Sequence, residues 1–136
     1  MARQMIRAGQ RLPEREYRPG TVQLFLYNAA IWNAHRIHYD LPYAQQREGH
    51  PALLVDGPLQ GDWLTQLVYD WMEEGDELLS FQYSNRRAGY VGDVLTAAGE
   101  VVAVEAGRVN LALRLNNQTG QVITRGGASV RLAGAA

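Results

Sequence analysis

The hydrophobic pattern of the chain changes once, from a period near four to a period of two, and this change limits the folds that the chain can adopt. Between residues 58 and 72, large apolar residues recur every four positions, which predicts a helix with one wide apolar face. The residues that carry this spacing are Leu59, Trp63, Leu67 and Trp71. Gly75 is the expected C-cap of this helix.

Beyond that helix, apolar and polar residues alternate. The alternation is clear in residues 79–84 and again in residues 109–116, and it is typical of antiparallel strands that are covered on one face. Residues 116–120 predict a hairpin turn, and the small residues 126–128 allow a strand to bend or a helix to approach it closely. The simplest architecture is therefore an α+β fold in which one long helix lies on a curved antiparallel sheet.

The first part of the chain carries weaker signals. Residues 1–20 are polar and contain Pro13, Pro19 and Gly20, so we expect an N-terminal arm or an edge segment there. The apolar run in residues 21–32 is nearly continuous, and its period does not decide between a strand and a helix. With 136 residues, 46% of them hydrophobic, the chain is expected to form a single domain with one core over residues 21–136.

Composition excludes several classes of protein. The chain has no cysteine, which rules out a disulfide framework, a thiolate nucleophile and a cysteine-rich zinc site. The formal net charge is -1 and no basic run is longer than the pair Arg86 and Arg87, so no nucleic-acid partner is expected. No window reaches the ~18 continuous apolar residues of a membrane span, and the first residues lack the apolar run of a signal peptide. We therefore expect a cytoplasmic protein without a membrane partner.

Candidate site residues gather in two short segments. Asn33, His35, His38 and Asp40 place a carboxamide, two imidazoles and a carboxylate within eight residues, and Gly57 then opens the predicted helix. An imidazole can take up and return a proton near neutral pH, and the backbone N–H at a helix start can polarise a carbonyl group. Together the two segments predict chemistry on water and an acyl group.

A longer motif carries a family resemblance. Residues 38–44, His-Tyr-Asp-Leu-Pro-Tyr-Ala, match without a gap the second half of the motif Asp-x-Asn-Pro-x-His-x-Asp-x-x-Tyr-Ala. The chain therefore resembles the MaoC-like enoyl-CoA hydratases and dehydratases. The sequence of residues 25–40 is most similar to the branch that contains mesaconyl-CoA and itaconyl-CoA hydratases. The resemblance extends over residues 24–132 and implies a hot-dog fold, a curved antiparallel sheet wrapped around one long central helix.

The resemblance also implies an activity and its partners. It implies a hydro-lyase that adds water to, or removes it from, a 2-enoyl- or 3-hydroxyacyl-CoA thioester, with a branched dicarboxylic acyl such as mesaconyl or itaconyl as a candidate. No separate cofactor is implied, since coenzyme A enters as part of the substrate. Hot-dog domains usually pair, and pairing shelters their edge strands. The resemblance therefore implies a homodimer or a higher homo-oligomer.

Three residues carry the implied catalytic roles. In the family an aspartate and a histidine hold one water, and here Asn33 stands where the aspartate is expected, five positions before His38. A carboxamide cannot act as a base near neutral pH, so Asn33 would orient water through its carbonyl oxygen while His38 both accepts and donates the proton. The resemblance assigns the backbone N–H of Gly57 to the thioester oxygen.

Further residues are candidates for substrate contacts. The family histidine before the glycine is Asp56 here, which is either a second acid or base or, as we favour, a cap of the helix. Arg36, with Arg47 behind it, is the candidate cation for a dicarboxylic acyl group. His35 and Tyr43 complete the set; for His35 a substrate contact, a second base and a plain loop role remain open.

The favoured interpretations of two other polar sites are structural. Asp40 is expected to be the N-cap of a short helix that ends near Gln46, and we favour this interpretation over a role in orienting His38. Arg86 and Arg87 could meet the phosphates of coenzyme A, although an exposed pair at a strand end is usually solvated.

Two other functions remain as alternatives. Because Asn33 replaces the family aspartate, the chain could be a non-catalytic hot-dog partner or an acyl-thioester-binding subunit. A zinc or iron site formed by His35, His38 and Asp40 ranks last, and no metal is expected.

Overall fold

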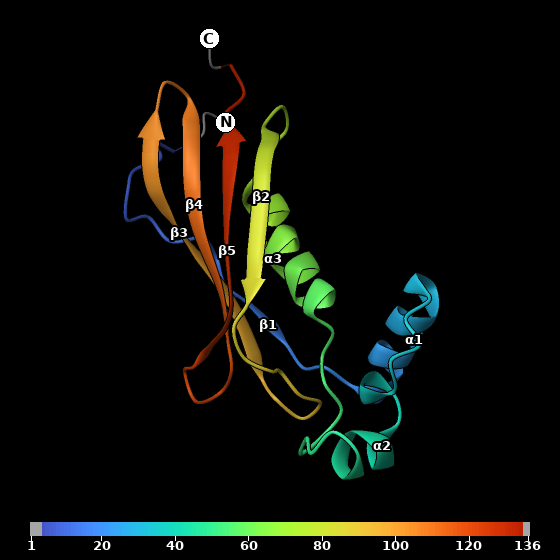
Figure 1. The fold of residues 1–136 in the computed structure, drawn as a ribbon. Helices are drawn as coiled ribbons and strands as arrows, with labels where there is room; N and C mark the ends of the chain where they lie inside the picture. Colours follow the sequence, from blue (N-terminus) through green and yellow to red (C-terminus); the bar gives the residue numbers. More distant parts are fainter. Residues whose placement is uncertain (1–3, 135–136) are drawn as a thin grey trace.

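A single antiparallel sheet and one long helix form the body of the molecule (Figure 1). The computed structural model describes residues 4–134. The five strands have the order β1-β3-β4-β5-β2. Their bounds are Arg15–Tyr17 for β1, Glu77–Asn85 for β2, Leu95–Glu105 for β3, Arg108–Asn116 for β4 and Val122–Arg131 for β5. The long helix α3, Gly57–Trp71, packs against β2, β3, β4 and β5, which agrees with the expected α+β architecture.

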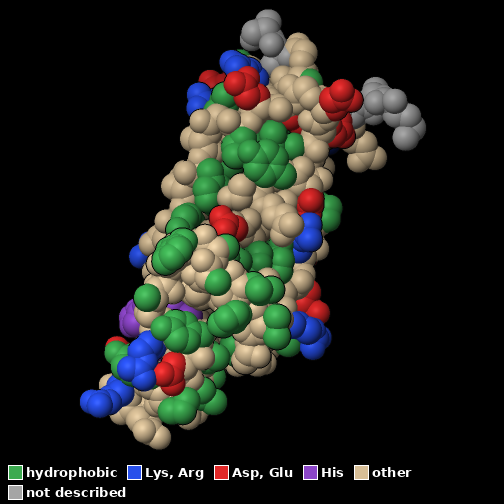
Figure 2. All heavy atoms as spheres, turned by 90° about the vertical axis from the view of Figure 1, so that its right-hand side faces the viewer, with side chains coloured by type: hydrophobic (Ala, Val, Ile, Leu, Met, Phe, Trp, Pro, Cys, Tyr) green, Lys and Arg blue, Asp and Glu red, His purple; other side chains and the backbone are tan. Residues whose placement is uncertain are grey.

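The smaller helices lie together beyond the N-terminal end of α3 (Figure 1). They are α1 (Thr21–Ile31), the 3-10 turn η1 (Arg36–His38) and α2 (Leu41–Gln46). The apolar run that the sequence left open between strand and helix is thus a helix. Of its apolar side chains Leu24 is buried, whereas Phe25, Leu26 and Trp32 are exposed. Figure 2 shows hydrophobic side chains at several places on the face of the molecule that lies on the right in Figure 1.

The core lies between α3 and the sheet. The predicted stripe of α3 faces this core, with Leu59, Trp63 and Leu67 buried and Trp71 partly buried against it. The hydrophobic effect of burying such side chains, about 1.5–3 kcal/mol each, holds the helix on the sheet. Within the described part of the chain, no helix is long and apolar enough to cross a membrane.

The expected end of the long helix is wrong. Met72 leaves the helical conformation directly, with ψ 150, and its N–H still bonds to the Val68 carbonyl. Gly75 instead has φ 87 and lies in the turn closed by the bond from Asp76 N to Glu73 O. The glycine is therefore used for the turn into β2, where a left-handed residue is needed, and the helix ends without it.

The strands follow the predicted alternation. Leu111, Leu113 and Leu115 of β4 all face the core and are at most 3% exposed. The turn over residues 117–120 joins β4 to β5, as predicted. A Cβ at Gly126 would lie 3.1 Å from Leu64 Cδ1, which confirms that the small residues of β5 let α3 approach.

The N-terminal segment belongs to the edge of the sheet. β1 pairs antiparallel with β3, and before it the N–H of Leu12 bonds to the carbonyl of Gly99. Leu12 is buried in the core, and the ring of Tyr17 stacks on Trp63 at 4.5 Å. This segment therefore extends the sheet, and its Tyr17 supports the middle of α3.

Candidate active site

The loop between α1 and α2 carries the predicted motif. Trp32 ends α1 in the left-handed conformation, with φ 57, and turns the chain into η1, which places His38. At the other end of the loop, Oδ1 of Asp40 accepts a hydrogen bond from Tyr43 N at 3.2 Å. This bond confirms the predicted N-cap of α2.

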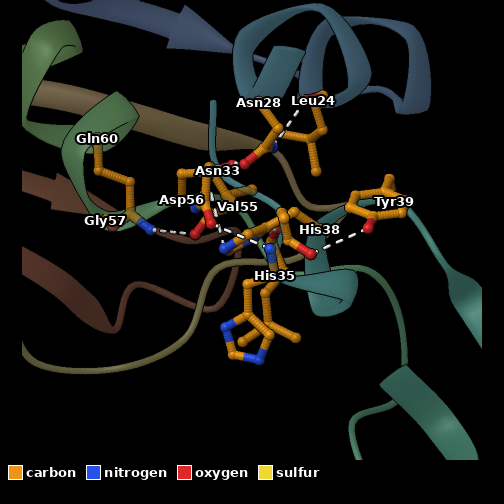
Figure 3. A network of polar contacts seen from close by, with 12 residues as sticks. Leu24, Asn28, Asn33, His35, His38, Tyr39, Val55, Asp56, Gly57 and Gln60 are labelled. Carbon is orange, nitrogen blue, oxygen red and sulfur yellow. Dashed lines mark hydrogen bonds and ion pairs between the residues drawn. The ribbon is translucent and has the colours of Figure 1, made fainter. Parts of the chain in front are cut away.

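The imidazole of His38 has one defined orientation. The side chain is buried, and Nδ1 lies 2.8 Å from the carbonyl oxygen of Leu54. Since a carbonyl can only accept, Nδ1 carries the hydrogen. Nε2 points the other way and lies 3.4 Å from Oδ2 of Asp56 (Figure 3). Nε2 is therefore the ring nitrogen that is left for chemistry.

Asp56 does not cap α3, so the favoured interpretation of this residue is wrong. It occupies the N-cap position, but its side chain makes no cap hydrogen bond. Oδ1 accepts from Nδ2 of Asn28 at 2.9 Å, and Oδ2 accepts from Nδ2 of Asn33 at 3.3 Å. These two amides and the imidazole of His38 draw the carboxylate away from the first turn of α3 and into the protein, where it is 1% exposed.

Gly57 and His38 line the same groove, which has a volume of about 400 Å³. As the first residue of α3, Gly57 has no carbonyl four residues upstream within the helix to receive its N–H, and this end of the helix carries partial positive charge. A Cβ at Gly57 would collide with Oδ1 of Asn85, so a larger residue here would have to displace the Asn85 side chain. Arg86 and Arg87 also line the groove.

A buried polar chain fixes the start of α3 to the sheet. Nδ2 of Asn85 lies 3.5 Å from the Gly57 carbonyl and donates to Oγ1 of Thr124 at 3.0 Å. The Thr124 hydroxyl donates to Oε1 of Gln60, whose Nε2 donates to the Val55 carbonyl at 3.3 Å. Both Gln60 and Thr124 are buried. Because such buried groups are costly to leave unpaired, this chain holds the Gly57 turn in place.

The other predicted contacts lie on the outer side of the loop. The guanidinium of Arg36 forms an ion pair with Asp40 at 2.8 Å and lies over the Tyr43 ring. Their hydrogen bond raises the pKa of Arg36 and lowers the pKa of Asp40. His35 is exposed, and its Nε2 lies 3.7 Å from Glu48. The structure does not bring Arg36, His35 or Tyr43 to the groove of His38.

Asn33 differs from its expected orientation. Its amide nitrogen points to Asp56, while its carbonyl oxygen accepts from the backbone N–H of His35 at 3.1 Å. The oxygen that was expected to hold water thus already has a protein donor. Asn33 lies beside the groove and lines a separate apolar hollow next to Phe25 and Tyr39.

Sequence reasoning missed the polar residues that support the site, namely Asn28, Gln60, Asn85 and Thr124. Asn28 offers one signal, because it is a polar residue inside an apolar run. The three ligands of the alternative metal site have separate partners in the structure. Among residues 4–134, no group of three or more His, Cys, Asp or Glu is arranged to hold a metal ion.

Comparison with known proteins gives the family. Residues 2–91 match the sequence model of hydroxyacyl-thioester dehydratase type 2. A segment of 45 residues is 57% identical to mesaconyl-C(4)-CoA hydratase of Chloroflexus aurantiacus, and covers 33% of this chain and 16% of that protein. A segment of 43 residues is 40% identical to the mitochondrial hydroxyacyl-thioester dehydratase type 2 of Schizosaccharomyces pombe, and covers 32% of this chain and 14% of that protein. Both matches thus span a small part of these relatives.

Solved structures give the fold. The (R)-hydratase of A. caviae involved in PHA biosynthesis superposes with a TM-score of 0.85 at 24% identity, over 96% of this chain and 99% of that one. The ChsH1-ChsH2 complex of Mycobacterium tuberculosis gives 0.84 at 20% identity, over 94% and 99%. The MaoC-like dehydratase of Rhodospirillum rubrum gives 0.78 at 18% identity, over 94% of each chain. The chain therefore has the MaoC-like hot-dog fold and belongs to the hydroxyacyl-thioester dehydratase type 2 family.

Proposed function

We propose that this chain is a hydro-lyase that adds water across the double bond of a 2-enoyl thioester, or removes it from a 3-hydroxyacyl thioester. The observation that carries this proposal is that His38 and the first residue of α3, Gly57, line one groove. A group that moves a proton and a group that polarises a thioester carbonyl thereby face the same substrate. The names of the family and of its relatives support the same reaction class.

The proposed mechanism divides the work between these two residues. The Gly57 N–H donates to the thioester oxygen, where negative charge develops as water adds to C3. The Leu54 carbonyl keeps the hydrogen of His38 on Nδ1, so that Nε2 faces the reacting water. Nε2 takes part in moving the proton from water to C2, and dehydration follows the same steps in reverse.

We propose coenzyme A as the carrier of the acyl group. Arg86 and Arg87 line the groove, and their backbone N–H groups both bond to the Ile123 carbonyl, which fixes their position at the end of β2. Among residues 4–134, no carboxylate forms an ion pair with either guanidinium. Their charge is therefore available for the phosphates of coenzyme A.

A branched dicarboxylic acyl group, such as mesaconyl or itaconyl, is the finer proposal for the substrate. The 45-residue similarity to mesaconyl-C(4)-CoA hydratase supports it. Arg36, the cation expected from the sequence, is balanced by Asp40 outside the groove.

The test is the loss of enoyl-thioester absorbance with the purified protein alone, on a panel of crotonyl-, mesaconyl- and itaconyl-CoA. We expect turnover of at least one of them, and the preferred acyl group identifies the substrate class. A parallel assay after treatment with a chelator should show the same rate. A complete lack of turnover would contradict the proposal.

A non-catalytic role beside a second hot-dog subunit is the alternative. Asn33 at the position of the family aspartate favours it, and the ChsH1-ChsH2 complex shows that such a fold occurs in a complex of two named chains. Under this alternative, turnover appears only when another subunit is added. The absorbance assay with the single chain separates the two functions.

We also propose that the chain forms a homodimer. β2 lies at one edge of the sheet, so one row of its backbone groups has no strand partner within the described residues. Such edges are usually covered, and exposed apolar residues of α1, including Phe25 and Leu26, offer further surface. Light scattering at micromolar concentration should give twice the mass of 15.2 kDa. A monomeric mass with activity retained would contradict a dimeric enzyme.

A further inference from the structure

We propose that Asp56, and not Asn33, supplies the carboxylate that acts with His38 on the reacting water. This inference rests on the hydro-lyase function proposed above, and adds a catalytic residue to it. The sequence alone favoured a helix cap for Asp56, but its side chain makes no such bond. Instead Oδ2 lies between Nδ2 of Asn33 and Nε2 of His38 (Figure 3).

Hydrogen-bond accounting requires a hydrogen between the two side chains, carried by one of them or by a water molecule. Nδ1 of His38 donates to the Leu54 carbonyl, so in the neutral ring Nε2 carries a lone pair. Oδ2 of an ionised Asp56 is also an acceptor, and the two atoms lie 3.4 Å apart. Two acceptors at this distance are compatible when one proton lies on either of them, or when a water molecule donates to both. Both situations serve the addition of water.

The geometry places any water that His38 activates beside Asp56. Nε2 is the only ring nitrogen that is left, and its distance of 3.4 Å from Oδ2 lets one oxygen lie about 2.8 Å from both atoms. Asp56 is 1% exposed and His38 8%, while His38 lines the groove. Solvent and substrate therefore reach this pair from the side of the groove.

Two neutral amides hold the carboxylate without removing its charge. Nδ2 of Asn28 also donates to the Leu24 carbonyl, at 2.7 Å, which fixes the amide on α1. Asn33 is fixed by the bond from His35 N to its carbonyl oxygen. Within the described part of the chain, His38 is the one basic side chain that pairs with Asp56. The role of Asn33 is thus to position Asp56.

The proposed step begins with one proton on Nε2 and an ionised Asp56. The water oxygen bonds to C3, its proton passes to Oδ2, and the electron pair of the C2–C3 double bond moves toward the thioester oxygen at the Gly57 N–H. That electron pair then forms the C2–H bond with the proton from Nε2. The proton now on Oδ2 crosses to Nε2 and restores the starting state. One proton is taken from water and one is given to C2, so the step is balanced.

The first test exchanges carboxylate and carboxamide. Asp56→Asn should lower kcat at least about 100-fold with KM changed less than about 3-fold, since positioned proton transfer contributes 10²–10⁴-fold. Asn33→Asp should lower kcat at least about 10-fold, because like charges 3.3 Å apart repel. The double variant restores a single carboxylate at this point, and should be at least about 10-fold more active than Asp56→Asn alone. Asp62→Asn, an exposed carboxylate on the same helix, is the matched control and should keep the wild-type rate.

Two results would overturn the proposal: an Asp56→Asn variant that keeps more than about a third of the wild-type kcat, or a double variant no better than Asp56→Asn. Thermal unfolding of each variant shows whether it is folded. A second measurement applies if Asp56→Asn folds poorly. Asn33→Asp alone should still lower kcat, and a rise in its kcat would contradict the assignment.

A third measurement does not need activity. The chain has three histidines, and NMR of protein labelled with ¹⁵N-histidine observes their ring nitrogens. The His38 signals are assigned by their loss in His38→Gln. The Nε2 resonance of His38 should move in Asp56→Asn toward the position of a nitrogen without a proton, and should stay in Asp62→Asn. An unchanged Nε2 resonance would contradict the shared proton. Wild-type protein that is inactive on every thioester, yet shows this shift, would contradict the hydro-lyase function and not the pair.

Discussion

The loop between α1 and α2 has an inner and an outer face, and the two faces hold similar side chains in different states. On the inner face, the ring nitrogens of His38 each have a defined partner, the Leu54 carbonyl and Asp56. On the outer face, three residues earlier, the side chain of His35 is 51% exposed, and its nearest charge lies 3.7 Å away on Glu48. Burial and fixed partners, and not residue type, distinguish the imidazole that we propose for catalysis from the exposed one.

The two aspartates of the region show the same contrast. Asp40, on the outer face, caps α2 and pairs with Arg36, which lowers its pKa. Asp56, at the equivalent position before α3, makes no cap bond and receives two amides and an imidazole. A carboxylate with an arginine partner stays ionised, whereas one beside an imidazole can exchange a proton with it. The comparison therefore separates a structural aspartate from a candidate catalytic one.

The largest expected effect tests the two histidines against each other. His38→Gln should lower kcat about 1000-fold, because it removes the group that accepts and donates the proton, whereas His35→Gln should change kcat less than about 3-fold. Steady-state kinetics on the preferred enoyl-CoA measure both. Equal losses in the two variants would show that the inner and outer faces do not differ in function.

The next effect concerns the start of α3. Gly57→Ala should lower kcat about 10- to 100-fold, because the new Cβ collides with Asn85 and displaces the N–H that faces the thioester oxygen. Asn85→Ala in the same chain should restore part of the rate by removing the collision. Gly20→Ala, where a Cβ meets no atom within 4 Å, is the control. A Gly57→Ala variant with wild-type kcat would remove the glycine from the mechanism.

A smaller effect is expected at the rim of the groove. Replacing Arg86 and Arg87 together by Gln should raise KM for an acyl-CoA about 10-fold and leave kcat within about 2-fold, because two phosphate partners are lost. The thioester of N-acetylcysteamine has no phosphates and serves as the matched substrate, whose kcat/KM should not change. Parallel losses on both substrates would contradict contact with the phosphates.

The smallest effect tests the outer face for stability. Asp40→Ala should lower Tm by about 3 °C, and Asp40→Asn, which keeps a capping oxygen, by about 1 °C. Because the folded-state pKa of Asp40 is lowered, its contribution is complete above the unfolded pKa, about 3.9, and is lost as pH falls through the folded value. The difference in Tm between wild type and Asp40→Asn should thus be full at pH 6 and shrink below about pH 4. A difference that does not depend on pH would contradict the ion pair.

The regular elements could be predicted because their signals are local. The expected C-cap at Gly75 put the end of α3 too late, but the spacing of Leu59, Trp63 and Leu67 places its start to within one residue. The alternation in residues 109–116 places β4 in the same way. The apolar run before the site loop carried no period, and its helical form depends on how Leu24 and Asn28 are buried against other segments.

The site could be predicted only in part, because its partners are far apart in the sequence. His38 and Gly57 were identified from motif and resemblance, and the structure brings them to one groove. The orientation of Asp56 depends on Asn28, 28 residues earlier, and on Asn33, 23 residues earlier, and no local pattern reports such contacts. The charge of Arg36 made it a candidate substrate contact. In the structure this charge is paired with Asp40 outside the groove, which the charge alone did not indicate.

The chain of hydrogen bonds from Asn85 through Thr124 to Gln60 ties the first turn of α3 to two strands. The backbone of Gly57 is therefore held by the sheet, while its N–H, which has no acceptor within the helix, stays free for a ligand in the groove. The imidazole of His38 is held separately, by the Leu54 carbonyl in the segment that leads into α3. Under the proposed function, a thioester in the groove would thus contact two groups that different parts of the chain hold in place, Gly57 through the sheet and His38 through the Leu54 backbone.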